Sequence, residues 1–207
     1  MSELMRKMKR GGVSVLGTAD YLADFWGRYR DASGIFWKLE RRQEFKESDV
    51  PSWAAAAAGD WPRALALIGQ MRAEVAEEFA AVHKLDRRRI RIAESPVSPY
   101  LQWEMHVLRM RAGEGEEIRV VDAAAVRDWE RDCLLPELAV FQDSAVYQLL
   151  YTAEGALEGA RRSTDPGLIV QAESQVSALF ESGEDLESFF GREIAPLPSP
   201  AWGSEQR

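Results

Sequence analysis

Apolar and polar residues repeat along the chain with two different periods, which predict helices and strands. Apolar side chains recur every three or four positions between residues 18 and 32, which predicts a short amphipathic helix with Thr18 as its N-cap. From residue 35 to 42 the period is two, which predicts a strand that is half-buried or lies at the edge of a sheet. A long helix with apolar residues on one face follows its capping residue, Asp60, and runs as far as Val82. The first part of the chain therefore predicts a helix, a strand and a helix in that order.

The middle of the chain predicts a strand-helix-strand unit. Residues 88–94 alternate basic side chains with isoleucine, which is typical of a strand with one apolar face. Ser98 followed by Pro99 is a strong helix-start signal, and a second short strand is predicted at 117–121. Two strands joined by a helix of about fifteen residues are expected to be parallel, with a right-handed crossover.

The last third of the chain predicts an antiparallel meander and closing helices. A helix is expected at 123–132, and a final long helix is expected after Asp165-Pro166. Three strand-like segments lie between them, at 137–141, 145–151 and 156–163. We therefore assign the chain to the α/β class with a mixed sheet, in which one parallel β-α-β unit continues into a meander and helices pack at both termini.

The domain organisation predicted from these patterns is simple. Residues 18–192 are expected to form a single α/β domain, because 207 residues suffice for one domain with a substantial core. Residues 1–17 are expected to be a flexible basic arm; no apolar stretch follows the basic residues, so they do not resemble a secretory signal. Residues 193–207 contain several prolines and are expected to form a disordered tail.

Composition and charge narrow the class of protein. Hydrophobic residues make up 46% of the chain, but no stretch approaches the roughly 20 apolar residues that span a bilayer, so no membrane association is expected. The net charge of −8 disfavours nucleic acid as a partner unless basic residues cluster. One basic cluster occupies residues 84–91. Its Arg87, Arg89 and Arg91 could present guanidinium groups to phosphate, or they could neutralise neighbouring acids.

Cysteine, histidine and motif content point away from common catalytic chemistries. A single cysteine, Cys133, excludes an intramolecular disulfide and fits a reducing compartment, so a cytoplasmic location and a buried Cys133 are expected. With His83 and His106 as the two histidines, we expect no metal site and no cofactor. The phosphate-binding glycine loops, the GxSxG elbow, HExxH and CxxC are all absent.

The best candidate site lies where the two predicted parallel strands end, because ligands of open sheets bind beyond the carboxyl ends of such strands. The helix after Ser98 would point its free N–H groups at an anion there. The candidate catalytic residues are Glu94, Tyr100 and Glu104. The candidate ligand-binding residues are Ser95, Ser98, Arg41, Arg89, Arg119 and Asp122.

A purely structural interpretation of the same residues is also open. Glu94 could bond loop amides, and Ser98 could serve only as a helix cap. Glu104 could pair with Arg87 or Arg119.

The chain resembles an uncharacterised actinobacterial family. The matching segments include FWKLERRQEF at 36–45, RIRIAESPVSPYLQWEMHVLR at 89–109 and GEEIRVV at 115–121. The family is described as a domain of unknown function and is often encoded near helix-turn-helix and developmental regulators, which would imply a regulatory role. The order of elements is also similar to half of a phospholipase D-like domain. That superfamily's active form needs His-x-Lys, which is absent here, so the similarity implies fold alone.

Two hypotheses of function follow. The first is a non-catalytic regulatory or accessory protein that binds a small anionic ligand or a protein partner, with a homodimer as one possibility. The second is an enzyme without a standard motif, a transferase or hydrolase acting on a nucleotide or an RNA-linked substrate such as aminoacyl-tRNA. A buried Glu94 or Glu104 beside an open pocket would favour the enzyme.

Overall fold

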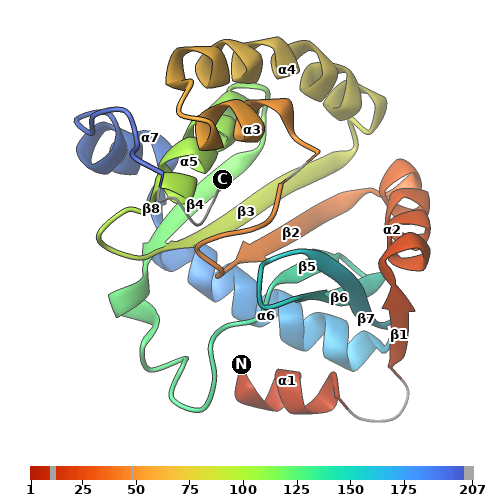
Figure 1. Ribbon diagram of the computed structural model, residues 1–207. Coiled ribbons are helices and arrows are strands. Elements are labelled where there is room, and N and C mark those ends of the chain that lie inside the picture. Colours follow the sequence, from red (N-terminus) through yellow and green to blue (C-terminus); the bar gives the residue numbers. More distant parts are fainter. Residues whose placement is uncertain (10–12, 48, 203–207) are drawn as a thin grey trace.

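A single mixed β-sheet organises the chain in a computed structural model that describes residues 1–9, 13–47 and 49–202 (Figure 1). Within these residues the sheet has eight strands in the order β1-β7-β6-β5-β2-β3-β4-β8. The strands are β1 Ser14–Gly17, β2 Gly34–Glu40, β3 Leu85–Ala93, β4 Glu117–Asp122, β5 Leu138–Phe141, β6 Ala145–Tyr151, β7 Leu157–Ser163 and β8 Glu184–Asp185. The helices are α1 Ser2–Lys7, α2 Thr18–Asp31, α3 Pro51–Ala57, α4 Trp61–Ala81, α5 Pro99–Gly113, α6 Pro166–Ser182 and α7 Leu186–Phe189, with a 3-10 turn at Ala123–Val126 and a π turn at Phe190–Ile194.

The sheet combines parallel and antiparallel pairing, which confirms the predicted fold class. Strands β2, β3 and β4 run parallel, and α5 crosses over between β3 and β4. Strands β5, β6 and β7 form the predicted meander. Residues 35–42 were predicted to form a half-buried or an edge strand, and the edge alternative is wrong for β2, because Trp37 pairs with Arg88 on one side and Val140 on the other. Polar and apolar residues alternate along β2 because Lys38 and Glu40 face the buried arginines of β3.

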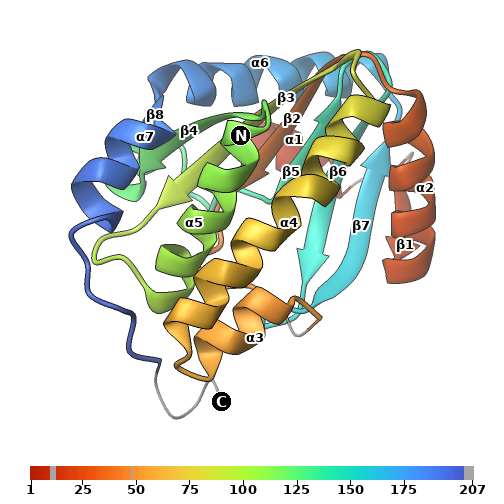
Figure 2. The same ribbon diagram turned by 90° about the horizontal axis from the view of Figure 1, so that it is seen from above.

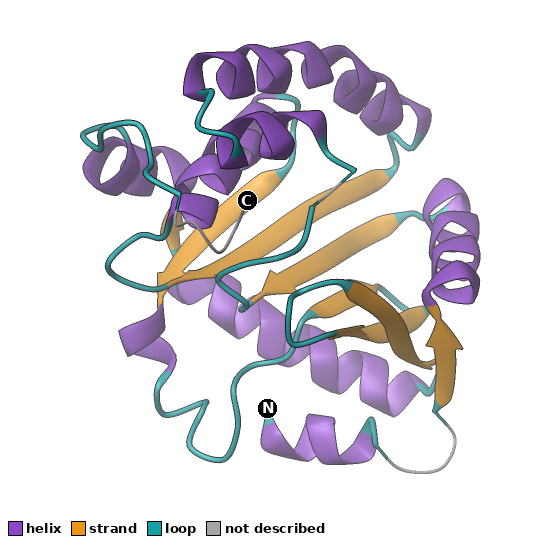
Figure 3. Cartoon of the chain, viewed as in Figure 1, coloured by secondary structure: helices purple, strands orange, loops and turns teal. Residues whose placement is uncertain are grey.

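Helices cover both faces of the sheet (Figures 1, 2 and 3). Helices α1 and α6 lie on one face, and α2, α3, α4 and α5 lie on the other, which we call the inner face. The α6 side is an ordinary apolar core, in which Trp37, Leu39 and Ile90 pack beneath Ile169 and Val176. No helix in the described part of the chain is long and apolar enough to cross a membrane.

The N-terminal segment differs from the flexible arm that was expected. Leu4 and Met8 are fully buried in the apolar core beneath α6, and β1 pairs with β7. The amphipathic spacing of α1 explains its docking, whereas its basic residues suggested an arm. Thr18 is not the N-cap of α2: Gly17 occupies that position, and the Thr18 hydroxyl donates to the carbonyl of Leu157. Residues 10–12 of the expected arm lie outside the described residues.

The C-terminal segment also contacts the domain instead of leaving it. Gln102 Nε2 donates to the carbonyl of Pro198 at 2.9 Å. Trp202 is buried against Trp53, with ring centroids 6.1 Å apart. The two aromatic rings and the hydrogen bond hold a proline-rich segment that composition alone suggested was disordered. Residues 203–207 of the expected tail lie outside the described residues.

The helix expected at 123–132 is reduced to a single 3-10 turn at Ala123–Val126. Asp122 Oδ1 accepts from the Ala124 N–H and caps the turn, and Val126 is its buried residue. Without a second apolar turn to bury, the chain continues as an exposed loop. Cys133 lies in this loop and is exposed, so the expectation of a buried cysteine is wrong.

Two glycine substitutions test how the N-terminal strand is held. Gly159 has φ +134°, and an added Cβ would lie 2.0 Å from the Leu16 carbonyl oxygen, so Gly159→Ala must push β1 away from β7. We expect it to lower the free energy of unfolding by about 2 kcal/mol or more. Gly69→Ala, at an exposed site inside α4 with nothing within 4 Å, should instead raise it by about 1 kcal/mol. Urea unfolding measures both, and equal effects would contradict this description of the β1–β7 contact.

Candidate functional site

The inner face of the sheet carries a row of buried charged side chains along β2 and β3. The period of two along each strand places Arg87, Arg89 and Arg91 on this face, where Lys38 lies opposite Arg89 and Glu40 opposite Arg91. All three arginines are buried, with 6%, 7% and 0% of their surface exposed. Burying charges is costly unless each is paired, so this face needs carboxylate partners from elsewhere in the chain.

Glutamates from β2, from α5 and from the residue just before β4 supply the partners of Arg89 and Arg91. Arg89 Nε lies 2.7 Å from Glu116 Oε1, and Arg89 Nη1 lies 2.8 Å from Glu40 Oε2. Arg91 Nε lies 2.7 Å from Glu104 Oε2. Arg111 on α5 reaches the second oxygen of Glu116 at 2.6 Å. Arg89 and Arg91 therefore neutralise internal acids, which is one of the two interpretations that the sequence left open, whereas Arg87 has no carboxylate partner among the described residues.

Burial and neighbouring charges move the pKa values of these glutamates in opposite directions. Burial opposes the ionisation of Glu116, but Arg89 and Arg111 outweigh it and lower its pKa to about 2. Burial raises the pKa of Glu104, and the nearby Glu40 adds to this effect against the opposing charge of Arg91. Burial also raises the pKa of Glu137 to about 7, against the hydrogen bonds from the backbone N–H groups of Arg42 and Arg41. The inner face thus holds both permanently charged and protonatable carboxyl groups.

The raised pKa of Glu137 predicts a pH dependence of stability. Its ordinary value is 4.5 and its folded value is about 7, so the folded state holds the proton more tightly and stability should fall as pH rises through this window. A rise in the pKa of Glu137 from 4.5 to about 7 corresponds to about 3 kcal/mol of folding free energy. Urea unfolding from pH 4.5 to 7.5 should show that Glu137→Gln removes this part of the fall, whereas Glu74→Gln on the exposed surface of α4 should not. An unchanged pH profile in Glu137→Gln would contradict the assignment.

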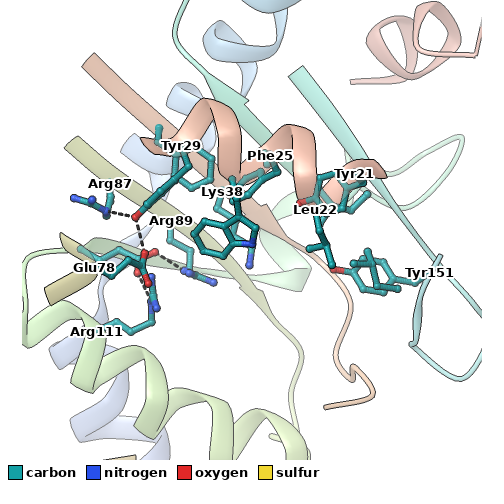
Figure 4. Close-up of a pocket in the computed structure, with 16 residues that line it drawn as sticks. Tyr21, Leu22, Phe25, Tyr29, Lys38, Glu78, Arg87, Arg89, Arg111 and Tyr151 are labelled. Carbon is teal, nitrogen blue, oxygen red and sulfur yellow. Dashed lines mark hydrogen bonds and ion pairs between the residues drawn. The ribbon is translucent and has the colours of Figure 1, made fainter. Parts of the chain in front are cut away.

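A cavity of about 290 Å³ opens over the inner face beside this network. Its walls come from helices α2, α4 and α5 and from strands β2, β3, β5, β6 and β7. Figure 4 shows the charged side chains Arg87, Arg89, Arg111 and Glu78 at one end, and Tyr21, Leu22 and Tyr151 at the other. The other lining residues are Phe25, Trp26, Tyr29, Phe36, Lys38, Glu116, Ala139, Leu149 and Leu157.

Exposed apolar side chains of α2 contribute to the wall of this cavity. Leu22 and Trp26 are 40% and 42% exposed, and both line the cavity while reaching solvent. Large apolar side chains next to a concave site are typical of ligand-binding sites. Two further hollows near the C-terminal end of α2 measure about 390 and 340 Å³, but no buried charged side chain lines them.

Several polar groups at the charged end have unused hydrogen-bonding capacity. Tyr29 Oη accepts from Arg87 Nε at 2.6 Å and donates to Glu78 Oε1 at 2.7 Å. Among the described residues, Glu78 Oε2, Arg89 Nη2 and both Nη atoms of Arg111 have no protein partner. Both carboxylate oxygens of Glu116 already have a partner, since each accepts a hydrogen bond from one guanidinium. Free donors and a free acceptor therefore line the same end of the cavity.

The strand-end crevice predicted from the sequence is occupied by structural interactions. Arg41 pairs with Glu94 at 2.6 Å and with Glu130 at 2.6 Å. The Glu94 side chain is half exposed, and Ser98 caps α5 by accepting from the Leu101 N–H. Asp122 caps the following turn, as described above. Ser98 is thus confirmed as a cap, whereas the Glu94 carboxylate pairs with Arg41 instead of the loop amides that were expected.

The remaining predicted residues are dispersed. Tyr100 is buried, and its hydroxyl donates to Glu47 at 3.3 Å. Glu104 pairs with Arg91 instead of the expected Arg87 or Arg119. Arg119 lies on the α6 side of the sheet, over the ring of Phe180. Ser95 is exposed in the loop after β3.

Of the nine candidate residues, Arg89 alone lines the cavity. The aromatic residues of α2 were missed because an apolar stripe predicts core packing equally well. The sequence signal that could have located the cavity was the row of alternating arginines, because burying that face of the strand requires charged partners inside the protein.

The sequence was also compared with known proteins. A family described as a domain of unknown function, DUF6879, matches residues 23–191. The chain belongs to this family. The match confirms the resemblance to an uncharacterised family, and no curated protein is significantly similar to the chain. The DUF6879 span includes every charged residue of the cavity, while Tyr21 and Leu22 lie just before it.

Proposed function

We propose that this protein is a non-catalytic, regulatory or accessory protein that binds a small molecule with an acidic group and an apolar body. The observation that carries the proposal is the cavity under α2, where free guanidinium N–H groups of Arg89 and Arg111 meet an aromatic wall. A charged hydrogen bond in a desolvated site is stronger than one in water, so these donors favour an anionic group. The apolar wall favours a ligand whose other end is hydrophobic.

The size of the cavity limits the ligand. Pockets for small molecules range from about 300 to 1,000 Å³, and this cavity lies at the lower end. It therefore suits one compact molecule better than a nucleotide or the end of an RNA.

The positions of the catalytic candidates also favour binding over catalysis. Glu94, Tyr100 and Glu104 do not line the cavity, and each is engaged in the hydrogen bonds or ion pairs described above. A transferase or hydrolase that used one of them as its acid or base would need that residue beside the bound molecule. A protein partner, a homodimer and a cytoplasmic location remain predictions from the sequence.

A thermal-shift screen tests the proposed function. The probes are 3-phenylpropionate, indole-3-acetate, phenyl phosphate, L-phenylalanine and L-tryptophan, and we expect at least one to raise the melting temperature. Leu22→Asp places a negative charge on the cavity wall and should weaken binding about tenfold, which corresponds to about 1.4 kcal/mol. Val170→Asp on α6, another exposed apolar site, should bind as the wild type does. The proposal fails if no acid binds, or if the two variants bind alike.

A further inference from the structure

The carboxylate of Glu78 lies at the same end of the cavity as the free guanidinium groups. We infer that the ligand is an α-amino acid, or a close derivative with a free amine and carboxylate, that carries an aromatic or large branched apolar side chain. This inference rests on the proposed function and names its ligand class.

Glu78 differs from Glu116, the other carboxylate that lines the cavity, because no cation neutralises it. Among the described residues it forms no ion pair within 4.0 Å, and its recorded partner is the neutral hydroxyl of Tyr29. Arg87 reaches Glu78 only through that hydroxyl, since its other donors go to the carbonyls of Leu85 and Val82. One oxygen of a half-buried carboxylate is therefore left for a ligand, and an ammonium group matches it in charge and donor capacity.

The guanidinium of Arg111 provides the opposite complement. Its Nε donates to Glu116, and its Cζ lies 5.0 Å from the centroid of the Phe79 ring. Both Nη atoms are therefore left for an acceptor. Glu78 and Arg111 both line the cavity at its charged end (Figure 4). A carboxylate without an amine would leave Glu78 uncompensated beside the bound anion, and an amine without a carboxylate would leave Arg111 unused. Both groups on one ligand satisfy both side chains.

The far end of the cavity specifies the side chain. Tyr21, Leu22 and Tyr151 lie at this end (Figure 4), and Leu157 pairs with Tyr151 between the neighbouring strands, so the wall here is almost entirely apolar. A small or polar ligand side chain would leave the apolar wall in contact with water, whereas a phenyl, indole or isobutyl group would cover it.

Isothermal titration at pH 7 with three matched probes tests the inference. L-phenylalanine carries both charged groups, 3-phenylpropionate lacks the amine, and 2-phenylethylamine lacks the carboxylate. We expect L-phenylalanine to bind at least about tenfold more tightly than either analogue, since each loses one charged hydrogen bond worth about 1.5–3 kcal/mol. L-alanine should bind far more weakly than L-phenylalanine.

Variants of neighbouring glutamates on α4 locate the ammonium site. Glu78→Gln should bring the affinities for L-phenylalanine and 3-phenylpropionate close together, and the exposed Glu77→Gln should leave the wild-type preference intact. Equal wild-type affinities for these two compounds would overturn the inference but leave the proposed function standing. Absence of binding by L-phenylalanine, L-tyrosine, L-tryptophan and L-leucine would also overturn it. Failure of the simple acids as well would overturn the proposed function with it.

Discussion

Replacing Arg91 with methionine is expected to lower the free energy of unfolding by about 3–5 kcal/mol. Arg91 is fully buried, and its Nε pairs with Glu104 while Nη1 donates to the Ile92 carbonyl at 2.9 Å. Methionine fills similar space but leaves Glu104 without a cation, close to the charge of Glu40. Most of the loss therefore comes from an uncompensated buried carboxylate and not from a cavity.

Urea unfolding at pH 7.5 measures this effect. Adding Glu104→Gln to Arg91→Met should recover at least about half of the loss, because the neutral amide removes the unpaired charge. Arg88→Met is the matched control. Arg88 lies three positions earlier on β3 but points to the α6 side, with 27% of its side chain exposed, so its loss should cost less than about 1 kcal/mol. If Arg91→Met and Arg88→Met were equally stable, the internal charge network would not have the role assigned to it.

Replacing Arg111 with glutamine is expected to weaken binding of the best aromatic acid from the thermal-shift panel by about 10- to 100-fold. The change removes a charged donor worth about 1.5–3 kcal/mol to an anionic ligand. Folding should be largely preserved, because Glu116 keeps its second partner, Arg89, at 2.7 Å. Titration calorimetry measures the affinity, and thermal unfolding without ligand checks the fold.

Arg109→Gln is the control for this variant. Arg109 lies two positions earlier on α5, pairs with Glu187 at an exposed site, and does not line the cavity. The Arg109→Gln variant should bind the same acid with wild-type affinity. Similar losses in both variants would mean that general surface charge, and not the cavity, attracts the anion.

Most of the fold follows from local patterns in the sequence. Ser98, Asp60 and Asp165 cap their helices as predicted, because a short polar side chain before an apolar repeat has few other roles. The crossover between β3 and β4 and the meander also follow from the spacing of the strands. The position of β2 did not, because strand order depends on contacts between distant segments and its charged face resembles that of an edge strand.

The site was much harder to predict for a physical reason. Alternation placed Arg87, Arg89 and Arg91 on one face, but the glutamates that pair with Arg89 and Arg91 are Glu40, Glu104 and Glu116, which are far apart in the sequence. Arg87 bonds to the Tyr29 hydroxyl instead. Whether such arginines meet solvent or buried carboxylates depends on which helix covers the face. Similarly, the aromatic stripe of α2 packs on the sheet and also lines a cavity, and periodicity predicts only the first.

The central claim is that the cavity under α2 holds a small molecule, and native mass spectrometry of protein isolated gently from the organism that produces it tests this most directly. We expect the wild type to carry one compact small-molecule adduct, and we expect Arg111→Gln to lose it while Arg109→Gln keeps it. Wild-type protein at its bare mass, or an adduct retained equally by both variants, would contradict the account.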